Sequence, residues 1–230
     1  IFDLDNGAVV KKVRVNSDNL FTFDNRFIIE GAALGGGEHT LKITREGTGA
    51  VYFTNILQYF TMEEGITAAG HEIKVERTCY LLEKIPAEVA VEDSEGRVIT
   101  EGRLRYRRIL LKDGDTVKSG DLVQVELRLA ADNDYTYLCL EDMKPAGCEP
   151  TEVTSGGTSQ EGFWTWRELR DEKVVFFLGA LDRGEHLVRY RLRAEIPGVF
   201  HTMPTIIYGM YAPELRANAA ERILKIMDAN

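Results

Sequence analysis

The chain of 230 residues has few of the residues that build redox, metal or disulfide-rich sites. It contains three cysteines without a Cys-x-x-Cys pair, so a disulfide framework, a zinc ribbon and a dithiol redox motif are excluded. No two histidines have the H-E-x-x-H, H-x-E or H-x-x-x-H spacing that lets imidazoles share a metal. We therefore expect single loop or surface histidines at His39, His71, His186 and His201.

Long hydrophobic runs and an excess of basic charge are also absent. Apolar runs such as residues 174–178 are far shorter than the roughly 18–20 residues that cross a bilayer as a helix. The 37 acidic and 28 basic side chains give a formal net charge of -9 at pH 7, which repels nucleic-acid phosphates. The sequence thus predicts neither a transmembrane segment nor a nucleic-acid partner.

Catalytic and cofactor motifs are likewise missing. No G-x-S-x-G elbow occurs, and the glycine-rich residues 31–37 are followed by Glu38 and His39 where a phosphate loop needs Lys and Ser or Thr. The short runs 3–6 and 113–115 carry aspartates but do not continue into the spaced ligands of an EF-hand. Adjacent carboxylates are too common in an acidic chain to indicate a general acid and base. We expect no enzyme activity and no cofactor.

What the chain does contain is a period-2 alternation of apolar and polar residues. It is clearest in residues 123–129, and residues 188–196 repeat it. This alternation predicts antiparallel strands with one core face and one solvent face. The predicted core face holds Val123, Val125, Leu127, Leu129, Val188, Tyr190, Leu192, Ala194 and Ile196. The predicted solvent face holds Gln124, Glu126, Arg128, Arg189, Arg191, Arg193 and Glu195.

Turn residues separate several further short segments; of these, residues 173–178 are a continuously apolar run flanked by charge, which fits a central strand covered on both faces. Strands are expected at residues 9–15, 27–29, 40–44, 50–60, 73–82, 98–109 and 173–178. Residues 62–70 are polar and small, so we place a domain boundary there. Only residues 213–227 have the propensity of a helix, in their first half. The pattern favours an all-β chain of two antiparallel β-sandwiches in series.

Two cysteines lie close enough in the sequence to form a disulfide. Pro145, Ala146 and Gly147 form a strong turn signal between Cys139 and Cys148. A bond between these cysteines would close a short loop, which is worth about 2–3 kcal/mol in the entropic model. The alternative is two small thiols that fill the core, and Cys79 is single in either case.

Two groups of side chains are candidates for partner binding. Trp164 and Trp166 share one face of a predicted strand, where two indoles can stack on a sugar or a partner side chain. Aromatic residues also favour strand interiors, so filling the core is the preferred interpretation of both. Arg103, Arg105 and Arg107 share another strand face, which is either a solvated surface or a docking surface for an acidic partner.

Five segments carry a resemblance to a known family. They are residues 119–127 (SGDLVQVEL), 134–150 (DYTYLCLEDMKPAGCEP), 168–177 (ELRDEKVVFF), 191–200 (RLRAEIPGVF) and 210–216 (MYAPELR). In this order they resemble the C-terminal end of bacterial alpha-2-macroglobulin-like proteins. Residues 46–53 (EGTGAVYF) more weakly resemble the strand region that follows the thioester domain in that family.

The resemblance implies a fold and its boundaries. Residues 1–68 would be the C-terminal half of a CUB-like β-domain, which the thioester domain interrupts in the family. Residues 72–230 would be the last macroglobulin-like, receptor-binding-type β-sandwich, ending in a strand where propensity favours a helix. The expected fold is thus two antiparallel β-sandwich domains in series, the first incomplete and with exposed sheet edges. The start at Ile1, without Met, suggests part of a longer protein.

The resemblance also implies a function. The family consists of protease traps, and many members capture the attacker with a thioester formed at Cys-Gly-Glu-Gln. That motif does not follow Cys79, Cys139 or Cys148. We therefore expect a non-catalytic interaction portion of a bacterial alpha-2-macroglobulin-like protease inhibitor, packing against a helical thioester-type domain outside this chain.

The expected partners are other domains of the same parent chain, and proteases through the parent. The family implies a periplasmic, cell-surface or extracellular location. The alternative is a carbohydrate-binding or adhesive β-sandwich module of a larger surface protein, with Trp164 and Trp166 as its platform.

Overall fold

The computed structural model describes residues 1–31, 34, 37–58, 65–85, 99–101, 104–160 and 162–229. The chain separates into two compact units, Ile1–Asn55 and Ile56–Asn230. Within the described ranges the secondary structure consists of strands, with no α-helix, which confirms the predicted all-β class. It follows that this part of the chain holds no helix able to cross a membrane.

The first unit contains one small antiparallel sheet. In it β1 lies between β2 and β3; the bounds are β1 Phe2–Leu4, β2 Val9–Lys11 and β3 Leu41–Ile43. Among the described side chains of this unit, Leu4 is the one buried hydrophobic residue. The strand expected at residues 27–29 is wrong, as is the described part, 50–58, of the one expected at 50–60. The side chains of residues 50–58 are exposed, so no neighbouring layer covers them, whereas Phe27 and Ile29 are half-buried but their backbone has no strand partner in the described part of the unit.

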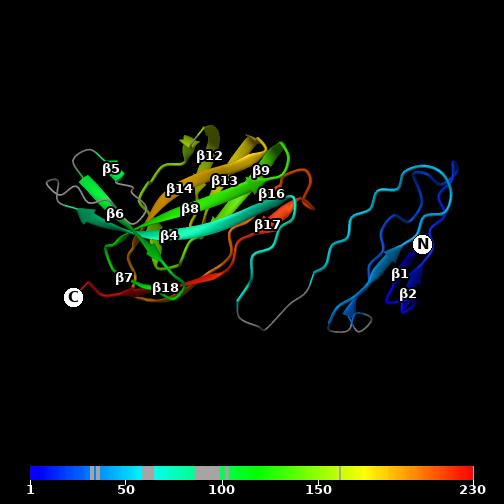
Figure 1. Ribbon diagram of the computed structural model, residues 1–230, viewed down its shortest axis with the longest axis horizontal. Coiled ribbons are helices and arrows are strands. Elements are labelled where there is room, and N and C mark those ends of the chain that lie inside the picture. Colours follow the sequence, from blue (N-terminus) through cyan, green and yellow to red (C-terminus); the bar gives the residue numbers. More distant parts are fainter. Residues whose placement is uncertain are drawn as a thin grey trace. The chain divides into compact units, whose positions relative to one another are not determined.

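The second unit is a sandwich of two six-stranded sheets. The sheet around β8, called the β8 sheet, has the order β10-β14-β8-β4-β6-β5. Its strands are β4 Ile73–Ile85, β5 Ile99–Glu101, β6 Leu104–Leu111, β8 Leu122–Ala131, β10 Cys148–Pro150 and β14 Gly184–Ala194. All its pairings are antiparallel, and Figure 1 shows β4 and β8 side by side along the sandwich.

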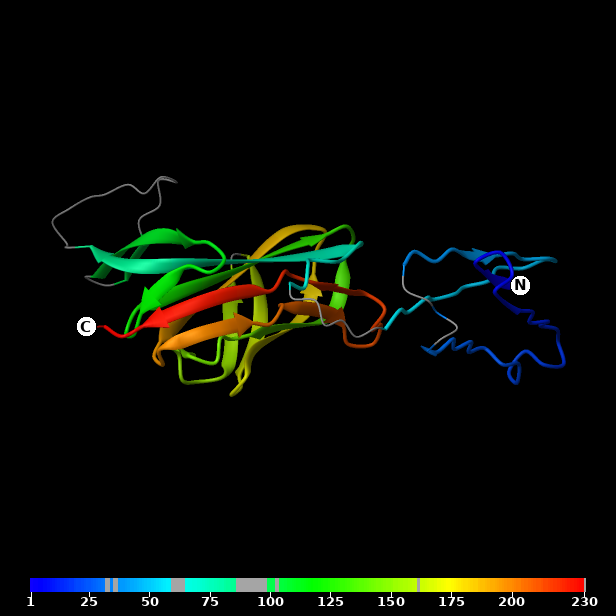
Figure 2. The same ribbon diagram turned by 90° about the horizontal axis from the view of Figure 1, so that it is seen from below.

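The opposite sheet, called the β9 sheet, has the order β11-β12-β13-β9-β16-β17. Its strands are β9 Tyr135–Met143, β11 Gly156–Gln160, β12 Phe163–Leu169, β13 Lys173–Leu181, β16 Ile206–Gly209 and β17 Arg216–Asn218. A smaller sheet contains β7 Thr116–Lys118, β15 Gly198–Thr202 and β18 Arg222–Met227. Figure 2 shows β18, in red, beside β15; β18 also pairs in parallel with β7.

The core lies between the inner faces of the two large sheets. The predicted inward residues of β8 and β14 are buried, and Phe176 of β13 contacts Tyr190 with ring centroids 6.0 Å apart. Ile196 lies beyond the end of β14 and is exposed, which corrects its assignment to the core.

The outer face of the β8 sheet differs from the prediction at two positions. Gln124 and Glu126 were expected in solvent, yet both are buried. The carboxylate of Glu126 accepts hydrogen bonds from Arg108 at 3.0 Å and Arg189 at 2.7 Å. The Arg108 guanidinium lies 3.8 Å from the ring centroid of Tyr80. Strand alternation decides on which face a side chain lies, whereas these contacts decide whether water reaches it.

Residues 213–227 form strands and not a helix. β17 pairs with β16, and β18 pairs with β15 on one side and with β7 on the other. Leu224 and Ile226 of β18 belong to the hydrophobic core, which a period-2 strand allows and the local helix propensity ignores. The family resemblance implies a strand in this region, and β18 is that strand.

Candidate interaction surface

A row of side chains, aromatic except for the buried Cys139, crosses the outer face of the β9 sheet. The strand register places Trp166 beside Phe177, Phe177 beside Cys139, and Cys139 beside Tyr208. The neighbouring positions Phe176, Leu140 and Ile207 are fully buried, so alternation directs the row away from the core.

We use the term aromatic face for this row together with the aromatic residues beside it. The aromatic face comprises Trp164, Trp166, Phe177, Tyr208, Tyr137 and Tyr211. Phe177 and Tyr208 are half-buried and the other four side chains are exposed, so this face is a candidate surface for contact with a partner.

The two tryptophans lie at one end of the aromatic face. Trp164 is 61% exposed and Trp166 is 45% exposed, so the preferred interpretation that both fill the core is wrong. Their ring centroids are 6.4 Å apart and the ring planes are inclined by 54°. A flat sugar platform needs coplanar rings, so this arrangement does not favour the carbohydrate alternative. A Cβ on Gly157 would lie 2.4 Å from the Trp164 ring, which shows how closely that ring covers β11.

Tyr137 lies at the other end of the aromatic face and has an unusual backbone. Its φ of 56° is in the left-handed region, although it belongs to β9 and is not glycine. Its ring is 56% exposed and meets the Tyr211 ring edge-on, with centroids 5.5 Å apart. Its carbonyl accepts a hydrogen bond from the Met210 amide at 2.8 Å. Such strain in a non-glycine residue is typical of functional positions.

The predicted arginine stripe is only partly visible. Arg103 lies outside the described residues. Arg105 is half-buried, and Arg107 is exposed and donates from Nε to Glu83 at 2.8 Å. The pairing with Glu83 neutralises much of the positive charge that an acidic partner would recognise. A docking role for this stripe stays a prediction.

The three cysteines are free thiols that the fold keeps apart. Cys139 faces outward on β9, whereas Cys148 on β10 belongs to the core of the sandwich, so the two lie in different sheets. Burial raises the pKa of Cys79 to about 11 and that of Cys148 to about 12. Burial also raises the pKa of Cys139. None of these thiols has the depressed pKa of a nucleophile or a redox cysteine.

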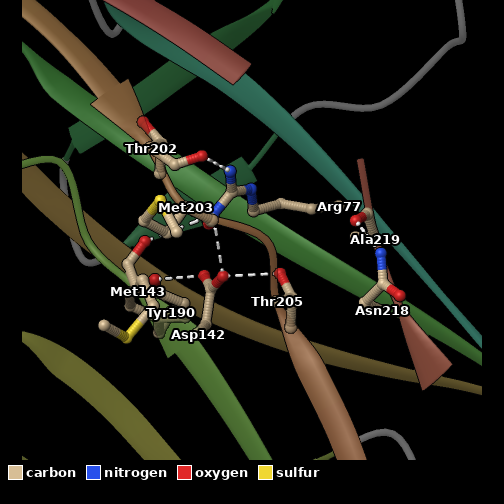
Figure 3. A network of polar contacts seen from close by, with 9 residues as sticks. All are labelled: Arg77, Asp142, Met143, Tyr190, Thr202, Met203, Thr205, Asn218 and Ala219. Atoms are coloured by element: carbon tan, nitrogen blue, oxygen red, sulfur yellow. Dashed lines mark hydrogen bonds and ion pairs between the residues drawn. The ribbon is translucent and has the colours of Figure 1, made fainter. Parts of the chain in front are cut away.

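The most polar part of the interior surrounds Asp142 of β9. Its carboxylate accepts hydrogen bonds from Arg77 at 3.0 Å, Thr205 at 2.6 Å and Tyr190 at 2.5 Å. Figure 3 shows these side chains converging between the sheets. Burial and the adjacent carboxylate raise the pKa of Tyr190, and the same carboxylate raises the pKa of Arg77 against the effect of burial.

The network has little free space beside it. The small cavity beside it has a volume of about 30 Å³ and is lined mainly by apolar atoms, so it accommodates about one water molecule. Within the described ranges, no group of three or more His, Cys, Asp or Glu side chains is placed to hold a metal ion.

The model of one protein family, the bacterial alpha-2-macroglobulin MG10 domain, matches residues 73–214, more than half of the chain. The chain belongs to the bacterial alpha-2-macroglobulin family. Similar curated proteins are the alpha-2-macroglobulins of Escherichia coli K12, 28% identical over 143 residues, and Thermotoga maritima, 28% identical over 137 residues. These alignments cover 53% and 54% of this chain, and 9% of each relative.

A solved relative has the same fold. It is a crystal structure of a Salmonella alpha-2-macroglobulin mutant, with a TM-score of 0.50 and 20% sequence identity. The similarity covers 70% of this chain and 10% of that chain. The chain thus has the macroglobulin-like β-sandwich that its segment resemblance implies, and it corresponds to a small part of the relatives it matches.

Several residues of the aromatic face were not predicted from the sequence. Tyr208 is separated by many residues from Trp166, and only the order β12-β13-β9-β16 brings their strands into one sheet. Tyr137 belongs to a quoted family segment, yet nothing in the strand pattern signals its left-handed backbone. The sequence signal for Tyr137 and Tyr208 is an aromatic residue near a strand end and a turn, which only weakly indicates a place in the aromatic face.

Proposed function

We propose that this chain is a non-catalytic C-terminal interaction portion of a bacterial alpha-2-macroglobulin-like protease inhibitor. Its aromatic face packs against a helical thioester-type domain outside the chain, and proteases meet it through the parent protein. The family and the alpha-2-macroglobulin relatives support this role. They also support a location outside the cytoplasm.

The observation that carries the proposal is the geometry at Tyr137. A left-handed backbone in an L-residue costs roughly 1–2 kcal/mol, and a half-exposed ring returns little of it within this chain. Strain of this kind persists only where the surrounding structure holds it, and it is concentrated at functional positions. Tyr211, 81% exposed, extends the same apolar contact. A helical domain that covers both rings would remove this surface from water.

The exposed apolar side chains of the first unit support the proposal that this chain is part of a larger inhibitor. We propose that residues 1–68 are the returning half of a CUB-like β-domain and that residues 72–230 are the macroglobulin-like sandwich. Leu4 alone is buried among the described hydrophobic side chains of Ile1–Asn55, whereas Phe21 is 95% exposed and Tyr52 is 92% exposed. Such a unit needs partner strands, because so little apolar surface leaves water.

Hydrogen exchange tests the packing directly. The amides of residues 134–139 and 206–212 are compared between the purified 230-residue chain and the parent protein. We expect slower exchange in the parent, and a return to fast exchange after a protease has cut the parent. Equal exchange in both forms would contradict packing at the aromatic face.

A pair of substitutions in the parent tests the inhibitory role. Tyr211→Asp places a charge on the aromatic face, and Leu110→Asp is the control on the β8 sheet, where Leu110 is 51% exposed. Trypsin is added, and its activity is followed on a large protein substrate and on a small peptide substrate. We expect only Tyr211→Asp to weaken protection of the large substrate. Equal behaviour of the two variants would refute the role of this face.

A further inference from the structure

The buried network around Asp142 lies where β16 begins. The register pairs Ile206 with Glu141, so the preceding residue, Thr205, stands opposite Asp142. The Thr205 hydroxyl donates to Asp142 Oδ1 at 2.6 Å, and both side chains are buried. This hydrogen bond joins β9 to the first residue before β16, at the position that decides which residues of the two strands face each other.

Arg77 of β4 binds two backbone carbonyls of the segment that immediately precedes Thr205. Its Nη1 donates to the carbonyl of Met203 at 3.1 Å, and its Nη2 donates to the carbonyl of Thr202 at 3.1 Å. The same Nη1 reaches Asp142. These carbonyls belong to the connection that leaves β15 in the small sheet and enters β16 in the β9 sheet. One guanidinium therefore fixes a chain crossing between sheets (Figure 3).

Stability alone does not account for this arrangement. The side chains of Arg77 and Asp142 are 2% and 1% exposed, and Arg77 Nε has no hydrogen-bond partner in the described part of the chain. Well-packed apolar side chains of similar volume usually stabilise a core as well as a buried ion pair does. The best-attested use of such a pair is to select one register among alternatives.

The ion pair of Arg77 and Asp142 would oppose a slip of β16 by two residues along β9. Alternation keeps the same residues inward after such a slip, so exposure alone resists it less than a slip by one residue. The slip would bring Ile207 opposite Asp142 in place of Thr205. The carboxylate would lose the Thr205 hydroxyl, and Arg77 would lose the carbonyls that precede it. Leaving buried charged groups with unmade hydrogen bonds is strongly unfavourable.

We propose that Arg77, Asp142 and Thr205 are positioning residues that fix the register of β16 on β9. Through that register they hold Tyr208 and Tyr211 in the aromatic face. The claim that these residues fix the register of β16 does not depend on the proposed function. The claim that the register affects docking of the aromatic face does rest on it.

The first test replaces the network by apolar side chains. A variant of the 230-residue chain carries Arg77→Met, Asp142→Leu, Tyr190→Phe and Thr205→Val. We expect it to fold with a similar melting temperature and to give a second set of amide resonances for Ile206–Gly209. The cross-strand NOE between Ile207 and Leu140 should weaken. A single set of resonances with the native NOE would overturn the proposal.

If the variant with four substitutions does not fold, single substitutions at Thr205 test the same proposal. Thr205→Val removes only the hydroxyl and keeps the branched shape, and Thr205→Ser restores the hydroxyl. The matched control is Thr165→Val, because Thr165 is also fully buried in the β9 sheet and donates to the Phe177 carbonyl at 2.8 Å. We expect faster amide exchange in β16 with Thr205→Val alone. Equal effects of Thr205→Val and Thr165→Val on β16 would overturn the proposal.

Docking is measured separately, in the parent protein with Thr205→Val. If β16 loses its single register while the aromatic face stays protected in the parent, the register assignment stands and its effect on docking fails. If the aromatic face of the unsubstituted parent exchanges as fast as that of the 230-residue chain, the proposed function fails and the register assignment stands. If β16 keeps its register in every variant, the proposal that Arg77, Asp142 and Thr205 fix this register fails, whatever the result for docking.

Discussion

Single side chains in this chain show what a strand pattern leaves undetermined. The alternation in residues 123–129 correctly predicts that Val123 and Leu127 point to the core. It places Glu126 in water, because it contains no information about Arg108 and Arg189, which approach from other strands. For Trp164 and Trp166 the error is the opposite one, since aromatic propensity for strands does not say which face is covered.

The backbone strain at Tyr137 can be measured with two substitutions that both remove the ring. In Tyr137→Ala the left-handed φ of 56° stays unfavourable, whereas in Tyr137→Gly it does not. We expect the glycine variant to be more stable than the alanine variant by about 1 kcal/mol in urea unfolding. An alanine variant of equal or greater stability would show that the site is unstrained.

The cysteines allow a second prediction at this scale. Ellman's reagent should detect all three thiols in denatured, unreduced protein, because Cys79, Cys139 and Cys148 are free. In native protein at pH 8 we expect slow reaction, since burial raises the pKa of Cys79 to about 11 and that of Cys148 to about 12. Detection of one thiol in the denatured, unreduced protein would instead indicate a bond between Cys139 and Cys148.

Among the elements, residues 66–69 form an additional contact of the second unit. Ala69 and Asn218 exchange two backbone hydrogen bonds, at 3.0 and 2.7 Å, and the Glu221 amide donates to the Ile66 carbonyl at 2.9 Å. The Glu221 carboxylate accepts from the Ile66 amide at 3.3 Å and contacts His201 Nδ1 at 2.9 Å. The segment predicted as a domain boundary therefore attaches, in its described part, along the chain that precedes β18.

This attachment should depend on pH. The His201 hydrogen bond lowers the pKa of Glu221 below its ordinary value of 4.5. A carboxyl group with a lowered folded-state pKa stabilises the fold above its unfolded pKa, and the contribution disappears as pH falls through the folded value. Glu221→Gln should therefore cost more unfolding free energy at pH 7 than at pH 3. Urea titrations at both values check this, and a cost that does not change with pH would contradict it.

Strand positions in the second unit were more predictable than those in the first. The expected strands at 73–82, 123–129 and 173–178 all lie within β4, β8 and β13. One covered face gives the first two a period-2 pattern, and cover on both faces gives the third a continuous apolar run. At residues 50–58 most side chains are apolar, yet all are exposed and lack a covering layer. Hydrophobicity without a partner surface does not specify a strand.

For the whole molecule, the division into Ile1–Asn55 and Ile56–Asn230 predicts unequal stability. A chain starting at Ile56 should unfold cooperatively, with a melting temperature close to that of the full chain, because it contains the hydrophobic core. The isolated residues 1–55 should show no cooperative transition, since Leu4 is their one buried hydrophobic side chain among those described. Circular dichroism of both fragments measures this. Cooperative melting of the short fragment would contradict the need for partner strands.

The position of β18 has a consequence for synthesis of the chain. β18 lies between β15 and β7, although it is the last strand in sequence and β7 precedes it by about a hundred residues. During translation β7 and β15 emerge without their partner in this small sheet, because each pairs there with β18, and the sheet cannot form until residues 222–227 leave the ribosome. A chain truncated before residue 222 would form a sandwich that lacks the strand joining these two edges, with Val117 and Phe200 open to aggregation.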